Sequence, residues 1–150
     1  MTESGPLTAD THHLLACVLD EILPPRPSAQ LPGAEQLGLA DAVATAVART
    51  PPLHAMIVHG LMDLDAAAHT RHGQGFATLA GPDRVALLHE QGFVLPLSLY
   101  AYIAYYEHPQ VVAALGLEPR PPHPKGYELE PGELALLDPV RARPPLYRSA

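Results

Sequence analysis

The chain has 150 residues, a length at which one core can bury about 70% of the surface that the unfolded chain exposes. Hydrophobic residues make up 47% of the chain and charged residues only 17%, so the composition is sufficient for a packed core. The net charge is −7, and the nine Lys and Arg residues form no cluster, which argues against a nucleic-acid partner. The single cysteine, Cys17, cannot form an internal disulfide, so the fold does not need an oxidising compartment.

Proline and glycine residues divide residues 1–117 into helical segments. The first helix is predicted from Thr8, a candidate N-cap, to Leu23, because the prolines at 24–25 disfavour helical geometry in the residue before them. Further helices are predicted at 39–49, from the prolines at 51–52 to His72, from Pro82, at 95–107 and at 111–115. In the helix that opens at Pro82 we expect Val85, Leu88 and Phe93 to face inward.

Residues 118–150 differ from the rest of the chain because eight of the 33 are proline. No helical or alternating period is apparent at that spacing, so we expect an extended arm. The arm also carries apolar side chains that a solvated linker would not need: Tyr127, Leu134, Leu136, Leu137, Val140, Leu146 and Tyr147. Strand signals are weak throughout. The predicted fold is therefore all-α: a small irregular bundle of about five or six helices over 1–117 and a proline-rich extended arm over 118–150, in the same structural unit.

One histidine cluster is a candidate metal site. Asp65, His69 and His72 lie four and three residues apart, so their side chains can share one helical face. Zinc accepts two imidazoles and a carboxylate. The same residues also fit a solvated helix end, since histidine interacts favourably with the carbonyl groups there. We favour the second interpretation and predict no metal in this chain.

No arrangement for nucleophilic catalysis is apparent. The chain lacks a Gly-x-Ser-x-Gly elbow, and Ser98 lies in an apolar helix where its hydroxyl is expected to bond back to a carbonyl. Cys17 lies in an apolar helical pattern with His13 one turn away, and burial would raise the pKa of its thiol. The chain also lacks a c-type haem motif and a glycine-rich phosphate loop. We therefore predict no catalytic residue and no cofactor in this chain.

Four tyrosines fall within seven residues of one predicted helix: Tyr100, Tyr102, Tyr105 and Tyr106. Residues 102, 105 and 106 share a side of that helix and 100 points elsewhere, so one buried face cannot hold all four. Tyrosine is enriched at protein interfaces because it offers a large area and a hydroxyl group. We expect some of the four to belong to the core and others to an interface, together with His108 just after them.

The chain resembles the gluconate 2-dehydrogenase subunit 3 family in four stretches whose order and spacing together carry the likeness. These stretches are Asp20-Glu-Ile-Leu-Pro-Pro25 with Pro32-Gly-Ala34 and Gly38; Leu64-Asp-Ala66 through His72-Gly73 with Phe76-Ala77 and Leu79; Tyr105-Tyr106 with His108-Pro109 and Ala114-Leu-Gly116; and Pro121-Pro-His-Pro-Lys-Gly-Tyr127. None of them is a chemical motif in itself.

The resemblance implies a non-catalytic helical small subunit that binds, stabilises or helps to mature a large flavoprotein of the glucose–methanol–choline (GMC) type, which oxidises a sugar or alcohol. In such complexes the FAD belongs to the large subunit, and a cytochrome often accepts the electrons. Small subunits of glucoside 3-dehydrogenases are the nearest variant. We expect the interface to include Tyr100, Tyr102, Tyr105, Tyr106, His108, His123, Tyr127, Leu137 and Tyr147.

Family members commonly carry a twin-arginine export signal, and the first residues of this sequence show none. We therefore expect a cytoplasmic protein, or a periplasmic one if it is exported with a partner. No apolar run approaches the roughly 20 residues that cross a bilayer, so no membrane span is expected. Two other functions stay open at this point: a helical adaptor without a redox partner, and a metalloprotein that uses Asp65, His69 and His72.

Overall fold

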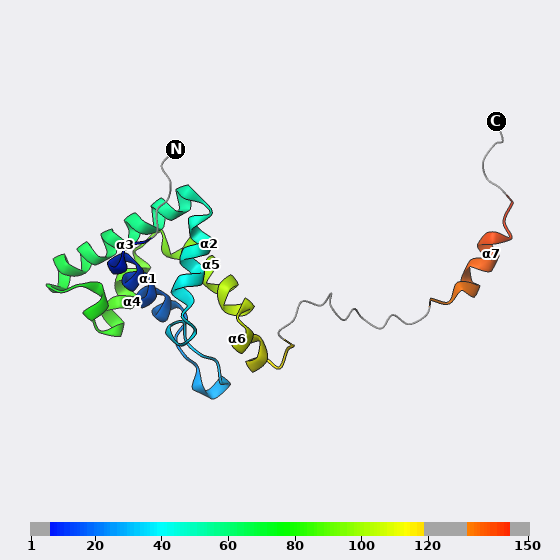
Figure 1. Cartoon of the computed structure of the whole chain (residues 1–150), viewed down its shortest axis with the longest axis horizontal. Coiled ribbons are helices and arrows are strands. Elements are labelled where there is room, and N and C mark those ends of the chain that lie inside the picture. The colour runs from blue at the N-terminus through cyan, green and yellow to red at the C-terminus, as the bar shows by residue number, and fades with distance from the viewer. Residues whose placement is uncertain (1–6, 119–131, 145–150) are drawn as a thin grey trace. The chain divides into compact units, whose positions relative to one another are not determined.

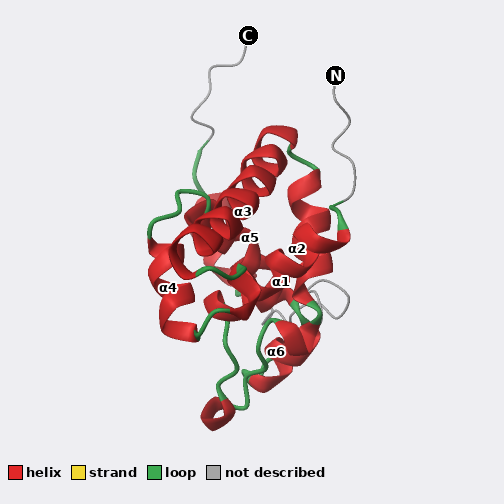
Figure 2. Ribbon diagram, turned by 90° about the vertical axis from the view of Figure 1, so that its left-hand side faces the viewer, coloured by secondary structure: helices red, strands yellow, loops and turns green. Residues whose placement is uncertain are grey.

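The structure, a computed structural model, describes residues 7–118 and 132–144. The chain divides into two compact units, Met1–Pro119 and Arg120–Ala150. The described part of the first unit contains six α-helices (Figure 1): α1 (Ala9–Ile22), α2 (Leu39–Ala48), α3 (Pro51–His72), α4 (Gly81–His89), α5 (Val94–Glu107) and α6 (Pro109–Ala114). Short 3₁₀ turns η1 (Pro27–Ala29), η2 (Glu35–Leu37) and η3 (Phe76–Thr78) lie between them. Figure 2 shows only helices and loops in the described residues, which confirms the all-α prediction.

The helix ends follow the breakers in the sequence. Thr8 caps α1 as predicted, because its hydroxyl oxygen accepts a hydrogen bond from the backbone N–H of Thr11 (3.2 Å). The helix α3 begins on Pro51 itself, since a first-turn residue needs no N–H donor. It ends at Gly73, whose φ of 73° lies in the left-handed region, and the Gly73 N–H donates to the His69 carbonyl (2.9 Å). Local chemistry therefore sets the bounds of these two helices.

One hydrophobic core joins all six helices. The helix α2 contacts α1, α3 and α5, while α4 packs on α1 and α3, and α6 on α5. The largest fully buried side chains are Phe76, Leu15, Leu19, Leu39, Ile57, Leu61, Leu64, Leu87, Leu97, Val18, Val43 and Val111. Truncating one of the larger side chains in this set to alanine lowers the free energy of unfolding by on the order of 2–5 kcal/mol. The core is thus the main source of stability of this unit.

The predicted inward face of α4 needs one correction. Leu88 and Phe93 are buried as expected, but Val85 is 41% exposed and Leu87 is buried instead. The reason is Arg84, which lies on the inward face three residues before Leu87 and is only 22% exposed in its side chain. Helical periodicity that treats every arginine as a surface residue therefore assigns Val85 to the buried face of α4 in place of Arg84 and Leu87.

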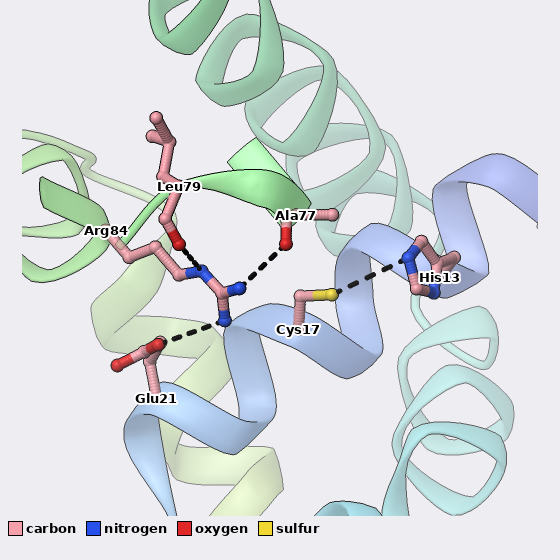
Figure 3. Close-up of polar contacts among 6 residues, drawn as sticks. All are labelled: His13, Cys17, Glu21, Ala77, Leu79 and Arg84. Carbon is pink, nitrogen blue, oxygen red and sulfur yellow. Dashed lines mark hydrogen bonds and ion pairs between the residues drawn. The ribbon is translucent and has the colours of Figure 1, made fainter. Parts of the chain in front are cut away.

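Arg84 is accommodated because every polar part of its side chain is bound (Figure 3). Its Nε donates to the Leu79 carbonyl (3.0 Å) and its Nη2 to the Ala77 carbonyl (2.7 Å). Its Nη1 donates to Oε1 of Glu21 on α1 (3.2 Å), and the guanidinium lies 5.9 Å from the centre of the Phe76 ring. These contacts tie the η3 loop to α1 and α4. The role of Arg84 is therefore structural.

The start of α5 is held against α3 by a close approach at Gly60. A Cβ at this position would lie 2.2 Å from the Phe93 ring, well inside any real contact distance. Because Gly60 has no side chain, the Phe93 ring can occupy this space. Phe93 directly precedes α5, so this packing fixes where α5 begins.

The second unit is described over residues 132–144. Here Leu134–Leu137 form a 3₁₀ turn, η4, and Asp138–Arg141 form a single helical turn, α7. The proline spacing did not predict these turns. Pro139 stands in the first turn of α7, where proline is tolerated. Their apolar side chains Leu134, Leu136, Leu137 and Val140 are exposed within this unit.

Candidate functional site

The carboxylate of Asp65 has a structural role at the end of α3. Its Oδ1 accepts a hydrogen bond from the backbone N–H of Phe76 (2.8 Å), and its Oδ2 lies 3.6 Å from Nε2 of His69. Gly75 passes close by, since a Cβ there would lie 3.1 Å from Oδ1 of Asp65. The pair therefore anchors the η3 loop to α3. In the described ranges, no group of three or more His, Cys, Asp and Glu side chains is placed to hold a metal ion. His72 lies in the last turn of α3.

The candidate nucleophiles are engaged or protonated. The Ser98 hydroxyl donates to the Val94 carbonyl one turn earlier (2.7 Å), as expected from the sequence. Sγ of Cys17 lies 3.9 Å from Nε2 of His13 (Figure 3), and burial raises the pKa of this thiol. A raised pKa keeps the thiol neutral near pH 7, so this sulfur is a poor nucleophile. Neither side chain is arranged for catalysis.

The structure separates the four tyrosines of α5. Tyr105 is buried, and its hydroxyl donates to the Pro32 carbonyl (2.9 Å). Tyr102 and Tyr106 are 45% and 55% exposed, and the Tyr106 ring meets the Tyr105 ring edge-on with 5.3 Å between centres. Tyr100 packs against the core from another side of the helix. Thus one tyrosine belongs to the core, one borders it and two lie at the surface.

The exposed tyrosines are part of a larger apolar surface. Along α5 the inward residues Leu97, Ala101 and Tyr105 are buried. On the opposite side a second apolar row faces solvent, and it consists of Leu95, Leu99, Tyr102, Ile103 and Tyr106. We call this row the α5 face. Leu95 is 81% exposed and Leu99 59%. Scattered exposed leucines are ordinary, but a continuous row on one helix marks an interaction surface.

Sequence reasoning found the tyrosines of this surface but not Leu95, Leu99 or Ile103. The signal was present, because residues 94–106 include no charged side chain. A helix that is apolar on all sides needs cover on all sides. Among the described residues, α1, α2 and α6 contact α5, while Leu95, Leu99 and Ile103 stay exposed.

Two hollows border α5. The first, of about 390 Å³, is lined by Ile22, Leu23, Pro24, Arg26, Leu31, Tyr102, Tyr105 and Tyr106, and we call it the tyrosine pocket. The second, of about 620 Å³, lies between α2 and α5. Its lining includes Tyr100, Ile103 and His108. Nδ1 of His108 also accepts the backbone N–H of Gln110 (3.3 Å) and so caps α6.

The other predicted interface residues lie in the C-terminal unit. Leu137 is 44% exposed in η4. His123, Tyr127 and Tyr147 lie outside the described residues. The candidate site that the structure itself supports is therefore the α5 face with the hollows beside it.

Comparison with known proteins gives one match. The family described as gluconate 2-dehydrogenase subunit 3 matches residues 9–92, which is more than half of the chain and runs from α1 to just before α5. No curated protein and no solved structure matches the chain. In the part of the chain that the structure describes, none of the helices has the length and apolar character to cross a membrane.

Proposed function

The chain belongs to the gluconate 2-dehydrogenase subunit 3 family, and from this membership we propose that it is a non-catalytic small subunit of a flavin-dependent dehydrogenase. In this proposal it binds and stabilises, or helps to mature, a large subunit of the GMC type that oxidises a sugar or an alcohol. The large subunit holds the FAD and the catalytic residues. Electrons leave the complex through an acceptor such as a cytochrome, without passing through a group on this chain.

The α5 face is the observation that carries the proposal. Burying one large apolar side chain contributes roughly 1.5–3 kcal/mol, so a row of five exposed ones is a strong driving force for association. Association entropy and side-chain ordering offset part of that gain. Tyrosine is among the residue types that dominate binding energy at the centre of a contact, and Tyr102 and Tyr106 belong to this row. A surface of this kind is expected of a subunit and is unfavourable in a chain that acts alone.

The polar groups of the chain support a non-catalytic role. Asp65 binds a backbone N–H, Glu21 pairs with Arg84, and the Ser98 hydroxyl bonds to its own helix. These side chains are used to hold loops and helices in place. The chemistry of the complex is therefore assigned to the partner.

The experiment that tests this proposal pairs the chain with a candidate large subunit, a flavoprotein of the GMC type from the same organism. We expect the two proteins to elute as one complex in size-exclusion chromatography. Reduction of a dye acceptor with a sugar substrate should require the large subunit. The purified small chain should show no flavin absorbance and no turnover. Turnover by the small chain alone would contradict the non-catalytic assignment, and separate elution would contradict the subunit assignment.

A further inference from the structure

The tyrosine pocket has walls that are fixed by the chain itself. Arg26 and Leu31 form a two-way backbone pair, in which the Arg26 N–H donates to the Leu31 carbonyl (2.9 Å) and the Leu31 N–H to the Arg26 carbonyl (3.2 Å). The hydrogen bond from Tyr105 to Pro32 joins the same loop to α5 (2.9 Å). The pocket is thus held on two sides before any partner arrives, which lowers the entropy lost on binding.

The chemistry of the pocket is aromatic and apolar with a single cation. Tyr102 and Tyr106 are one helical turn apart on α5 and stand half exposed at the pocket. Ile22, Leu23 and Leu31 supply the apolar side. Exposed aromatic side chains such as these pack against proline rings, and a polyproline segment is extended and already ordered before it binds.

Arg26 is the charged group of this pocket. The guanidinium lies close enough to Tyr105 to oppose the rise in the pKa of the Tyr105 hydroxyl, a rise that burial causes. Across residues 7–118 and 132–144, Arg71, Arg84 and Arg141 each have a carboxylate partner. Arg26, like Arg49 and Arg143, makes no such pair within those ranges and is exposed, and among these three it is Arg26 that lines the tyrosine pocket. A carboxylate from outside can therefore bind it through a charge-assisted hydrogen bond.

We propose that the tyrosine pocket binds an extended, proline-containing segment of the partner subunit that places a carboxylate on Arg26. The inference rests on the proposed function for the identity of the partner, and it adds the chemistry of one contact. The proline rings pack on Tyr102 and Tyr106, and the acidic residue beside them pairs with the guanidinium. The α5 face supplies the larger apolar contact next to this pocket.

Two labelled probe peptides test the inference on the full 150-residue chain. The first repeats proline and glutamate (Pro-Glu-Pro-Pro-Glu-Pro), and the second has lysine in place of each glutamate. Fluorescence polarisation should show the glutamate peptide bound at least about tenfold more tightly than the lysine peptide, as expected for one charge-assisted contact. The substitution Arg26→Glu should reverse this preference. Tyr106→Ala should weaken binding of the glutamate peptide by about tenfold, the scale of one aromatic contact at an interface.

Arg49→Glu is the matched control, because Arg49 is exposed and lines the hollow between α2 and α5. It makes the same change of charge and should leave both affinities unaltered. Equal affinity for the two peptides, or an effect of Arg49→Glu in place of Arg26→Glu, would overturn the inference. Complex formation with the large subunit is measured separately on the unmodified chain. If that complex forms while Arg26→Glu leaves the peptide preference unchanged, the inference fails and the proposed function stands.

Discussion

The two sides of α5 are alike in composition and opposite in environment. The side that carries Leu97, Ala101 and Tyr105 is packed against neighbouring helices, while the α5 face carries leucine, isoleucine and tyrosine into solvent. In the described parts of the chain, 7–118 and 132–144, folding buries the first side and leaves the second exposed. From this difference we propose that α5 has two partners: the bundle covers one side, and a second protein covers the other.

The same comparison explains the absence of charge along α5. A helix at a permanent surface gains solubility from charged side chains on its outer side. No charged residue occurs between Val94 and Tyr106, whereas the two other helices of comparable or greater length, α1 and α3, carry charged residues within their span. The absence of charge along α5 supports our proposal that its outer side is a contact surface.

The largest expected effect is a difference in the free energy of unfolding between substitutions on the two sides of α5. Leu97→Ala removes a side chain that is 0% exposed, so it should lower the free energy of unfolding by about 2–5 kcal/mol. Leu99→Ala, two residues further on the exposed side, should change it by no more than about 0.5 kcal/mol. Urea denaturation followed by circular dichroism measures both. Equal losses would mean that the α5 face is covered within the chain.

A second prediction concerns the packing that sets the start of α5. Gly60→Ala should destabilise the chain by about 1–3 kcal/mol, because the new methyl group would meet the Phe93 ring. Helix propensity alone predicts the opposite sign, a gain of roughly 1 kcal/mol. Gly81→Ala is the control, since nothing lies within 4 Å of a Cβ there. A stabilised Gly60→Ala variant would show that Phe93 moves away at little cost.

A third prediction asks whether the α5 face is the whole interface. Truncation after Leu117 removes the C-terminal arm with its exposed apolar residues Leu134, Leu136, Leu137 and Val140. We expect most of the helical circular dichroism signal to remain, because the six-helix core is intact. Affinity for the large subunit should fall about tenfold or more, equivalent to about 1.4 kcal/mol. Unchanged affinity would confine the contact to the first unit, at the α5 face and the tyrosine pocket.

The smallest expected effect concerns the polar end of α3. His69→Ala combined with His72→Ala should lower the free energy of unfolding by no more than about 1 kcal/mol, the scale of interactions at a helix end. Elemental analysis of the dialysed, untagged chain should find clearly less than one equivalent of zinc or iron. A stoichiometric metal that is lost in the double variant together with the fold would establish a metal site and contradict our interpretation of this cluster.

The sequence predicted the six helices of the first unit because their ends depend on local chemistry. Thr8, Pro51 and Gly73 act through their own backbone geometry or a hydrogen bond to a near neighbour. Contacts between distant positions were not predictable in this way. The Arg84–Glu21 pair spans 63 residues, and the bond from Tyr105 to Pro32 spans 73. These contacts decide that Arg84 faces inward and that Tyr105 belongs to the core.

The candidate site was predicted in part for the same reason. A cluster of tyrosines is visible in the sequence, and helical periodicity separates Tyr100 from the other three. The exposure of Leu95 and Leu99 depends on which neighbours pack on α5, and periodicity cannot assign a side when both sides are apolar. Arg26 lies in the loop that follows α1, far from the tyrosines in the sequence, and it lines the same pocket only in the folded chain.

The most direct test of the account compares two matched surface residues in one binding measurement. Leu99 on α5 is 59% exposed and Met62 on α3 is 58% exposed, so either can be changed to aspartate with a similar effect on the free chain. Isothermal titration with the large subunit should give an affinity at least about tenfold weaker for Leu99→Asp, because a buried charge would lie in the apolar contact. Met62→Asp should bind as the unmodified chain does. A loss of affinity for Met62→Asp with no loss for Leu99→Asp would place the interface on α3 and contradict the role that we assign to the α5 face.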